Sequence, residues 1–323
     1  MWAGVAFALA AGLMWGLVFV APLMLPEYPA VLLSMGRYLA FGLIALPLGW
    51  LDRADIARLS RADWIESLKL VVVGNLLYYL CLASAIQRTG GPLPTMIIGT
   101  LPVVIAISAN LRDHRRDGRL PWPRLAPSLL LIAAGIACVN QAELAQLDGP
   151  AAGGRLRYAS GVVLAIIAVI CWTWYPLRNA DWLRNHPGRN PRTWSTAQGL
   201  TILPLALAGY FLLWLWIRLS GTALAMPFGP RPAAFVGLMA AIGLFSSWLG
   251  SLCWNQASQR LPTALAGQLI VFETLAALSY VFILRGRWPP HLTVAGVVLL
   301  LAGVLWAVRI KPVKYQELPA EAK

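Results

Sequence analysis

The sequence has 323 residues, of which 59% are hydrophobic and only 12% are charged. A soluble domain carries about twice that charged fraction, so the composition argues against an ordinary soluble enzyme or binding domain. The net charge of +13 does not indicate a nucleic-acid-binding protein, because the Lys and Arg residues are scattered through short segments between apolar runs. The expected surroundings of this chain are a lipid bilayer.

Apolar runs of about 20 residues recur from one end of the chain to the other, which is the pattern of membrane-spanning helices. The first run has no basic region before it and no clear cleavage site after it, so we expect a retained helix and not a signal peptide. No segment between the runs is long enough for a separate soluble domain. We predict an all-α integral membrane protein with ten transmembrane helices, at residues 2–22, 31–51, 67–87, 92–111, 124–143, 158–178, 194–217, 233–257, 262–284 and 290–310.

The positive charges indicate how the predicted helices are oriented. If the N-terminus is cytoplasmic, eighteen Lys and Arg residues lie on the cytoplasmic side and seven on the other, with Arg37 inside the second span. Such an excess is typical of the cytoplasmic side of a membrane protein. We therefore expect a multi-pass protein of a bacterial-type inner (plasma) membrane with both termini cytoplasmic. The sequence leaves the oligomeric state open and is compatible with a monomer.

The chain contains a weak internal repeat. One alignment of the chain with itself places Trp15 on Trp172, and a second alignment places Cys81 on Cys253. Each half of the chain then holds five predicted spans, and an odd number of spans places the halves in opposite orientations across the membrane. Inverted repeats of this kind are found in transporters whose substrate site lies at the repeat interface. The two predicted repeats, which form one membrane unit, are residues 1–150 and 151–323.

Several short motifs resemble those of a known family. They are Met14-Trp15-Gly16 in the first span, Arg37 in the second, Pro-Thr pairs that begin the fourth and ninth spans, and Gly-rich fifth and tenth spans. Over its whole length the sequence resembles the EamA-type members of the drug/metabolite transporter superfamily. Its many Trp residues and the segment QLIVFETLAAL (268–278) are similar to the aromatic amino-acid exporters of the YddG type. The glutamate that usually closes the fourth and ninth spans of this family is absent here.

No motif indicates catalysis or a resident cofactor. The sequence has no HExxH, no Walker-type glycine loop and no nucleophile elbow. The four Cys residues lie inside apolar runs and none forms a CxxC pair, so buried small hydrophobic side chains are expected in place of disulfides or metal ligands. We predict that the chain is not an enzyme and holds neither a metal nor a cofactor.

Polar and aromatic residues at helical spacing inside spans are candidates for substrate binding. One such face lies in the third span and another in the eighth, and the alignment of Cys81 with Cys253 relates the two. They are expected to form two walls of one central cavity, although Ser and Asn also form ordinary hydrogen bonds between membrane helices. The candidate residues are Asn75, Tyr78 and Tyr79 in the third span, and Ser247, Ser251 and Trp254 in the eighth.

Four further residues are candidates for the same site. Trp15 and Trp172 lie deep in the first and sixth spans, where their rings could stack on a planar substrate or bind a cation, or could simply pack in the core. Thr100 and Gln268 occupy matching positions in the fourth and ninth spans. Gln268 offers both donors and acceptors to the backbone groups of an amino acid.

Glu273 and Arg37 are the only formal charges set well inside predicted spans. Ionisable groups at that depth face the bundle interior or water and are functional candidates. Glu273 could bind a substrate ammonium, carry a coupled proton, or form a hydrogen bond that holds neighbouring helices together. We expect Arg37 to extend toward the outer side or to cap a carbonyl, with a carboxylate ligand or an ion-pair partner as alternatives.

These features favour a transporter that exports small amphiphilic metabolites by alternating access through a central cavity. The resemblance implies aromatic amino acids as the substrates, and the aromatic faces are compatible with them. The alternatives are a broad-specificity drug or metabolite exporter of the same fold and a non-transporting membrane receptor.

Overall fold

A computed structural model describes residues 2–90, 92–111, 121–144, 154–221, 224–286 and 288–310. Within these ranges the protein is helical throughout and contains no β-strand, as the sequence predicts. Each predicted span coincides with helical residues. The helices up to residue 144 are α1 (Trp2–Gly16), the 3-10 turn η1 (Leu17–Phe19), α2 (Val20–Met24), α3 (Ala30–Leu51), α4 (Arg53–Ile56), α5 (Arg61–Leu70), the π-helix η2 (Val71–Leu77), α6 (Tyr78–Thr89), α7 (Pro92–Ile98), α8 (Leu101–Leu111) and α9 (Trp122–Leu144).

Long helices also make up the second half of the chain. α10 has 32 residues and α11 has 30. With a rise of about 1.5 Å per residue, each is long enough to reach across a bilayer. The helices from residue 154 onward are α10 (Gly154–Asn185), α11 (Pro191–Ser220), α12 (Pro232–Ile242), the π-helix η3 (Gly243–Leu249), α13 (Gly250–Arg260), α14 (Thr263–Leu269), α15 (Val271–Arg285) and α16 (His291–Val308).

In the described part of the chain, seven helical stretches are long and apolar enough to cross a membrane. They confirm that this is a helical membrane protein. The apolar parts of α9 and α16 are shorter, at Trp122–Cys138 and His291–Ala307, and α7 and α8 are separated by a break. The count of ten spans and the inversion of the two halves therefore remain predictions.

The helix ends follow from local sequence. Ser60 caps α5, because its hydroxyl accepts the Asp63 amide at 3.2 Å while the Asp63 carboxylate accepts the Ser60 amide at 2.9 Å. Asn190 caps α11 through the Arg192 amide, and Pro191 follows at the first helical position. Gly221 ends α11 with a φ of +66°, a conformation that other residues rarely adopt.

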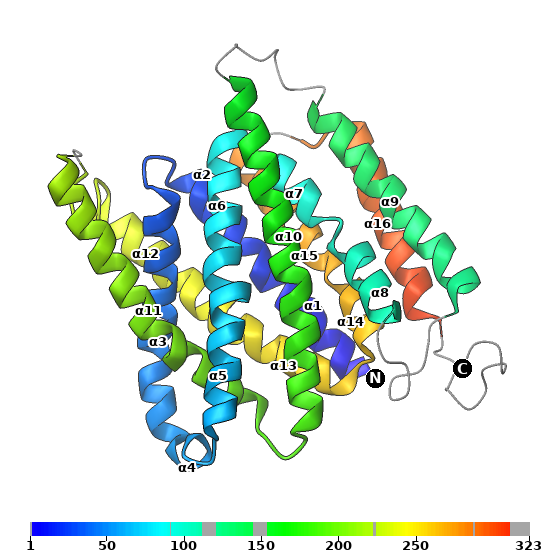
Figure 1. The fold of residues 1–323 in the computed structure, drawn as a ribbon. Coiled ribbons are helices and arrows are strands. Elements are labelled where there is room, and N and C mark those ends of the chain that lie inside the picture. The colour runs from blue at the N-terminus through cyan, green and yellow to red at the C-terminus, as the bar shows by residue number, and fades with distance from the viewer. Residues whose placement is uncertain are drawn as a thin grey trace.

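α1 runs diagonally through the bundle and packs against α13 and α15 (Figure 1). Gly12 and Gly16, which lie one helical turn apart, make this approach possible. A Cβ on Gly12 would lie 3.0 Å from the Glu273 backbone nitrogen, and a Cβ on Gly16 would lie 2.7 Å from the Ala276 Cβ. Small residues at this spacing let membrane helices approach closely, which fixes the height of Glu273 against α1.

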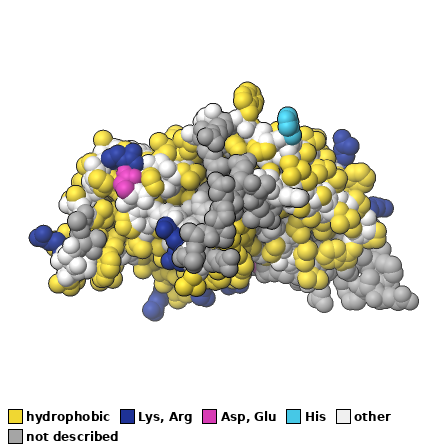
Figure 2. Space-filling model, turned by 90° about the horizontal axis from the view of Figure 1, so that it is seen from above, with side chains coloured by type: hydrophobic (Ala, Val, Ile, Leu, Met, Phe, Trp, Pro, Cys, Tyr) yellow, Lys and Arg dark blue, Asp and Glu magenta, His cyan; other side chains and the backbone are white. Residues whose placement is uncertain are grey.

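The remaining helices pack in pairs around this centre. α3 lies against α11, α6 lies against α10, and α9 lies beside α16 at one edge of the molecule (Figure 1). Apolar side chains cover most of the described surface in the view of Figure 2. Along the second half of α11, large side chains such as Phe211, Leu212 and Trp216 are exposed. Such a continuous apolar surface suits contact with lipid and not with water.

Candidate functional site

An aromatic cluster fills the centre of the bundle, where α1, α6, α10 and α13 meet. Trp15 contacts Trp172 edge-on with ring centroids 4.8 Å apart and contacts Trp254 at 5.2 Å. Trp172 also stacks on Tyr78 at 4.6 Å and on Tyr175 at 5.1 Å. All five side chains are buried. We call Trp15, Tyr78, Trp172, Tyr175 and Trp254 the aromatic cluster.

Two glycines allow these rings to lie so close to the backbone of neighbouring helices. A Cβ on Gly74 would lie 2.2 Å from the Tyr175 ring, and a Cβ on Gly250 would lie 2.8 Å from Trp15 Nε1. Since neither position has room for a side chain, the Trp15 ring of α1 lies directly on α13 and the Tyr175 ring of α10 lies directly on η2. The sequence predicted Trp15, Tyr78, Trp172 and Trp254 as site residues, and it gave Tyr175 only as an aromatic neighbour of Trp172 that could belong to the membrane interface.

Glu273 lies beside this cluster and is completely buried. Its Oε1 accepts a hydrogen bond from the Tyr78 hydroxyl at 3.3 Å, and its Oε2 accepts one from Trp172 Nε1 at 3.2 Å. These two bonds connect α15 with α6 and α10. Of the three roles open from the sequence, the contacts correspond most directly to a group that holds helices together, and they also place the carboxyl group at the edge of the aromatic cluster.

Arg37 is buried as well, with 4% of its surface exposed. The expectation that it extends toward the outer side, or caps a carbonyl, is wrong. Its Nε donates to Ser247 Oγ at 2.9 Å, and its guanidinium carbon lies 4.5 Å from the centre of the Tyr79 ring and 5.0 Å from that of Tyr38. The two rings and the hydroxyl hold the cation inside the bundle, so it need not reach toward water.

The third and eighth spans contain π-helices, which the sequence did not indicate. η2 and η3 are each seven residues long. The internal alignment that relates Asn75 to Ser247 also places η2 on η3. A π-helix has a wider turn than an α-helix, so the faces predicted at α-helical spacing are distorted here. The carbonyl of Asn75 accepts the Tyr38 hydroxyl at 2.7 Å, and the Tyr79 hydroxyl donates to the Val18 carbonyl at 3.3 Å.

The remaining predicted site residues are Ser251, Thr100 and Gln268, and they do not all lie beside the aromatic cluster. Ser251 is buried on α13, one helical turn before Trp254. Thr100 lies in the break between α7 and α8, where its hydroxyl donates to the Ile97 carbonyl at 2.7 Å within the same turn. The side chain of Gln268 lies outside the described part of the chain.

A network of buried amides extends the polar interior along α10, α11 and α13. Asn179 Nδ2 donates to Asn255 Oδ1 at 2.8 Å, and Asn179 Oδ1 accepts bonds from Trp194 Nε1 and Gln198 Nε2. Gln198 Oε1 in turn accepts the Tyr175 hydroxyl at 3.0 Å, which joins this network to the aromatic cluster. Only Asn255 could be recognised from the sequence as part of a polar face. Asn179 and Gln198 could have been noticed only as isolated amide side chains inside apolar spans.

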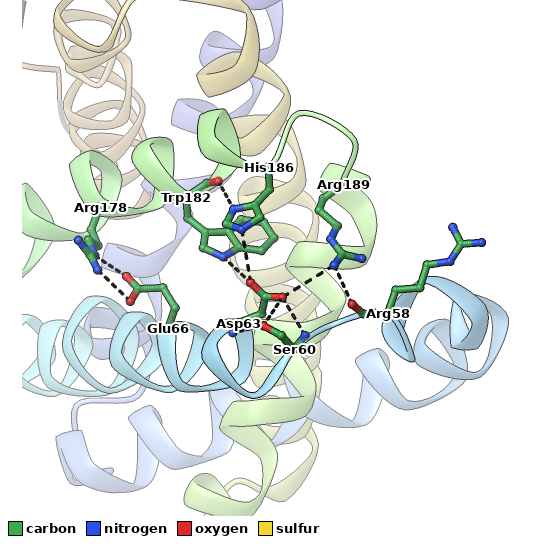
Figure 3. Close-up of polar contacts among 8 residues, drawn as sticks. All are labelled: Arg58, Ser60, Asp63, Glu66, Arg178, Trp182, His186 and Arg189. Atoms are coloured by element: carbon green, nitrogen blue, oxygen red, sulfur yellow. Dashed lines mark hydrogen bonds and ion pairs between the residues drawn. The ribbon is translucent and has the colours of Figure 1, made fainter. Parts of the chain in front are cut away.

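One end of the bundle is held together by charged groups on α5 and α10 (Figure 3). Glu66 forms a bidentate ion pair with Arg178, and Asp63 Oδ1 accepts a hydrogen bond from Trp182 Nε1 at 3.0 Å. The His186 ring stacks on Trp182 with its Nε2 3.8 Å from Asp63. These residues, which we call the α5–α10 latch, border a cleft of about 280 Å³.

The segment before α3 has its own connection to a distant part of the chain. Arg231 Nε donates to Glu27 Oε1 at 2.5 Å, and its backbone amide donates to the Tyr28 hydroxyl at 2.7 Å. The hydrogen bond from Arg231 lowers the pKa of Glu27. This second connection, the Glu27–Arg231 latch, ties the segment before α3 to the segment before α12. Both ends of the interior are therefore crossed by contacts.

Comparison with known proteins agrees with this architecture. The family described as the EamA-like transporter family matches residues 2–140. The chain is 56% identical to the inner membrane protein YtfF of Escherichia coli (strain K12) over 314 residues, which cover 97% of both proteins. The chain belongs to the EamA-like transporter family. It is thus a membrane transporter, and the resemblance to the EamA-type transporters inferred from the sequence is confirmed.

This EamA-like transporter also resembles a more distant relative and a solved structure. It is 23% identical over 303 residues to a probable terminal-alkyne amino-acid exporter of Streptantibioticus cattleyicolor (strain ATCC 35852 / DSM 46488 / JCM 4925 / NBRC 14057 / NRRL 8057), and the match covers 90% of this chain and 91% of the relative. A crystal structure with 15% sequence identity superposes with a TM-score of 0.68 over 94% of this chain and 96% of its own. The latter similarity shows a shared fold.

Proposed function

We propose that this transporter is an inner-membrane exporter or facilitator of aromatic amino acids that works by alternating access through a central cavity. The observation that carries the proposal is the aromatic cluster with Glu273 at its edge. Rings that stack on one another are suited to stack on a planar side chain as well, and Glu273 and Arg37 lie nearby as groups of opposite charge. The site is expected to consist of Trp15, Asn75, Tyr78, Tyr79, Thr100, Trp172, Ser247, Ser251, Trp254 and Gln268, with Glu273 and Arg37 as charged groups.

The names of two relatives are compatible with this proposal. One is an inner membrane protein with high identity over nearly the full length, which supports the same location here. The other is named as an amino-acid exporter and is more distant. The name of this relative thus supports an amino acid as the substrate class, whereas the preference for aromatic side chains comes from the sequence resemblance and is compatible with the aromatic cluster.

Packing between helices supports two inverted repeats as the moving parts. η2 and η3 correspond to each other in the same internal alignment that relates Cys81 to Cys253. α8 packs on α14 and α9 packs on α16, so elements at matching places in residues 1–150 and 151–323 lie against each other. In inverted-repeat transporters one repeat rocks against the other around a fixed site. The α5–α10 latch and the Glu27–Arg231 latch are then the contacts that must open alternately.

A broader exporter of drugs or metabolites with the same fold is the second candidate. Ring faces accept any flat molecule and select little among its polar substituents. The size and composition of the aromatic cluster would then set only the general shape of the substrate.

Flux in proteoliposomes tests the proposal. The purified protein should move Phe, Trp and Tyr down a concentration gradient faster than Thr or Met, because only the first three can stack on the cluster. Movement of none of the five would refute export of amino acids. Binding without flux would point to a receptor, and equal flux of unrelated flat molecules would favour the broader exporter.

A further inference from the structure

Several buried hydrogen-bond donors near the centre of the molecule have no acceptor. In the described part of the chain, Arg37 Nη1 and Asn75 Nδ2 have no hydrogen-bond partner, although both side chains are more than nine-tenths buried. Trp254 Nε1, inside the aromatic cluster, also lacks an acceptor. Buried donors in folded proteins are nearly always paired, since an unpaired one loses its bonds to water without replacement. These groups therefore have donor capacity that an acceptor from outside the chain can use.

Arg37 and Asn75 lie around the same tyrosine. The Tyr38 hydroxyl donates to the Asn75 carbonyl at 2.7 Å, and the Arg37 guanidinium lies 5.0 Å from the centre of the Tyr38 ring. Ser247 accepts from Arg37 Nε and so fixes how the guanidinium is turned. The unpaired donors thus come from α3 and from the π-helix η2, while η3 supplies the group that orients the cation.

The contacts present do not replace an acceptor for Arg37. Tyr38 and Tyr79 interact with the face of the guanidinium through their rings, and Ser247 accepts from Nε, which leaves the in-plane Nη1 without an acceptor. Among the described residues, no carboxylate forms an ion pair with Arg37, and both oxygens of Glu273 already accept bonds from Tyr78 and Trp172. A guanidinium presents paired donors whose geometry matches a carboxylate.

We propose that Arg37 and Asn75 bind the carboxylate group of the transported substrate. This inference rests on the proposed function and names the chemical class that the site accepts, namely small molecules with one carboxylate and an apolar or aromatic remainder. The neighbouring ring of Tyr79 supports it, because it contacts the face of the Arg37 guanidinium and leaves Nη1 without an acceptor. Glu273, whose oxygens accept bonds from Tyr78 and Trp172, is not needed for this carboxylate contact.

Three probes that share a phenyl ring show how much the carboxylate contributes to binding, separately from the ring and the ammonium group. They are L-phenylalanine, L-phenylalaninamide, in which a neutral amide replaces the carboxylate, and 3-phenylpropionate, which keeps the carboxylate and lacks the ammonium group. Binding is measured by the shift in thermal unfolding of the detergent-purified protein, because a ligand that binds only the folded state raises its stability. Flux in proteoliposomes is measured in parallel. The wild type should bind and move both carboxylates and should discriminate against the amide.

Arg37→Gln removes the cation, and Asn75→Leu removes the second donor while it keeps the branched shape of the side chain. Arg37→Gln should weaken binding of both carboxylates by roughly 10- to 100-fold and change binding of the amide much less, because a hydrogen bond to a charged group is lost. Asn75→Leu should show the same selectivity with a smaller loss. Arg218→Gln is the matched control, since Arg218 lies near the exposed end of α11 beside Trp214, away from the cluster.

The unliganded stability provides a second measurement. Removing a buried cation with an unpaired donor should leave the unfolding temperature of Arg37→Gln unchanged or higher, whereas a purely structural Arg37 would give a lower one. If Arg37→Gln does not fold, Arg37→Lys and Asn75→Leu carry the test. Lysine keeps the charge but cannot form paired bonds, so carboxylate binding should fall in that variant as well.

The outcomes of this inference and of the proposed function can be told apart. If the wild type moves L-phenylalanine but binds the amide equally well, or if Arg37→Gln and Asn75→Leu weaken all three probes alike, the carboxylate site is refuted and aromatic amino-acid export stands. If the wild type moves no aromatic amino acid but binds L-methionine in an Arg37-dependent way, the proposed function fails and the carboxylate site stands. If no carboxylate binds to the wild type, both are refuted.

Discussion

At the scale of single residues, the interior is organised by two charges with different surroundings. Glu273 has both oxygens satisfied by Tyr78 and Trp172, whereas Arg37 keeps an unpaired nitrogen. A buried charge whose bonds are complete stabilises the contacts around it, and one with free bonding capacity is suited to a ligand. The aromatic side chains that hold Glu273 through their polar atoms also stack on one another through their ring faces.

Trp172→Phe should reduce flux of L-phenylalanine by about 5- to 50-fold, since it keeps a ring in the stack but removes the donor to Glu273 Oε2. Tyr78→Phe, which removes the donor to Oε1, should act in the same direction. Initial rates in proteoliposomes measure both. Trp214→Phe on α11, which replaces a lipid-exposed tryptophan, is the control. A Trp172→Phe protein that transports at the wild-type rate would show that this bond does not shape the site.

Glu273→Gln should fold and should keep downhill flux within about twofold of wild type. A glutamine oxygen can accept from Trp172 Nε1 while its amide donates to the Tyr78 oxygen, so both bonds survive in neutral form. We further expect flux of both proteins to be insensitive to an imposed pH gradient. Uphill accumulation driven by the gradient in the wild type alone would contradict the helix-linking role and assign proton carriage to Glu273.

Part of this site could be predicted from the sequence. Trp15 and Trp172 match in the internal repeat, and Glu273 is an acid in the middle of an apolar span, so each stands out without any structure. Tyr38 does not stand out, and Tyr175 fits the membrane interface as well as the core, because a tyrosine in a membrane helix is common and its partner lies on another helix. The direction of Arg37 depends on the rings it meets and on Ser247, which lies in the other half of the chain.

At the scale of helices, the site depends on close packing of α1 and on the two π-helices. Hydropathy predicts where a helix lies but not whether a stretch of it forms a wider turn, which requires the packing of its neighbours. The π-helix η2 is an example, because the Tyr175 ring of a neighbouring helix packs directly against Gly74 within it. The positions of the helices were therefore predictable, whereas the directions in which Asn75 and Ser247 point from the two π-helices were not.

Gly12→Ala should destabilise the protein by about 1 to 3 kcal/mol, because the added methyl group would lie 3.0 Å from the α15 backbone and push α1 away. The midpoint of thermal unfolding in detergent measures the effect. Gly237→Ala is a matched control, because no heavy atom lies within 4 Å of the added Cβ, and an alanine suits a helix interior better than glycine. Equal midpoints for the two variants would contradict the packing described for α1.

Glu66→Gln should open the end of the interior that the α5–α10 latch closes. The variant loses its bidentate ion pair with Arg178, so α5 and α10 separate more often. In a background with Cys81, Cys138, Cys171 and Cys253 replaced by alanine, a single cysteine at Ser251 should then react several-fold faster with a water-soluble maleimide.

Glu27→Gln in the same background provides the comparison, since it weakens the Glu27–Arg231 latch at the other end. The two variants should increase labelling from opposite sides of sealed vesicles. If Glu66→Gln leaves the labelling rate unchanged from either side, the latch does not control access to the interior.

At the scale of the whole molecule, an apolar exterior surrounds a polar and aromatic interior. The exposed apolar side chains of α11 face outward, and the amide network of Asn179 and Asn255 continues from the charged end of the bundle to the aromatic cluster. Composition alone predicts the membrane environment, because 12% charged residues cannot cover a soluble surface of this size. The course of the interior path could not be predicted, since it is built from residues of α6, α10, α11 and α13 that approach only in the folded protein.

Counterflow in proteoliposomes tests the central claim most directly, because it requires only a site that alternates between the two sides and does not depend on coupling to an ion gradient. Vesicles loaded with unlabelled L-phenylalanine and diluted into a trace of labelled L-phenylalanine should transiently accumulate label above its external concentration. Trp172→Ala vesicles with correctly folded protein should accumulate far less. Wild-type vesicles that only equilibrate the label, or that exclude it, would contradict the assignment of this EamA-like chain as an exporter of aromatic amino acids.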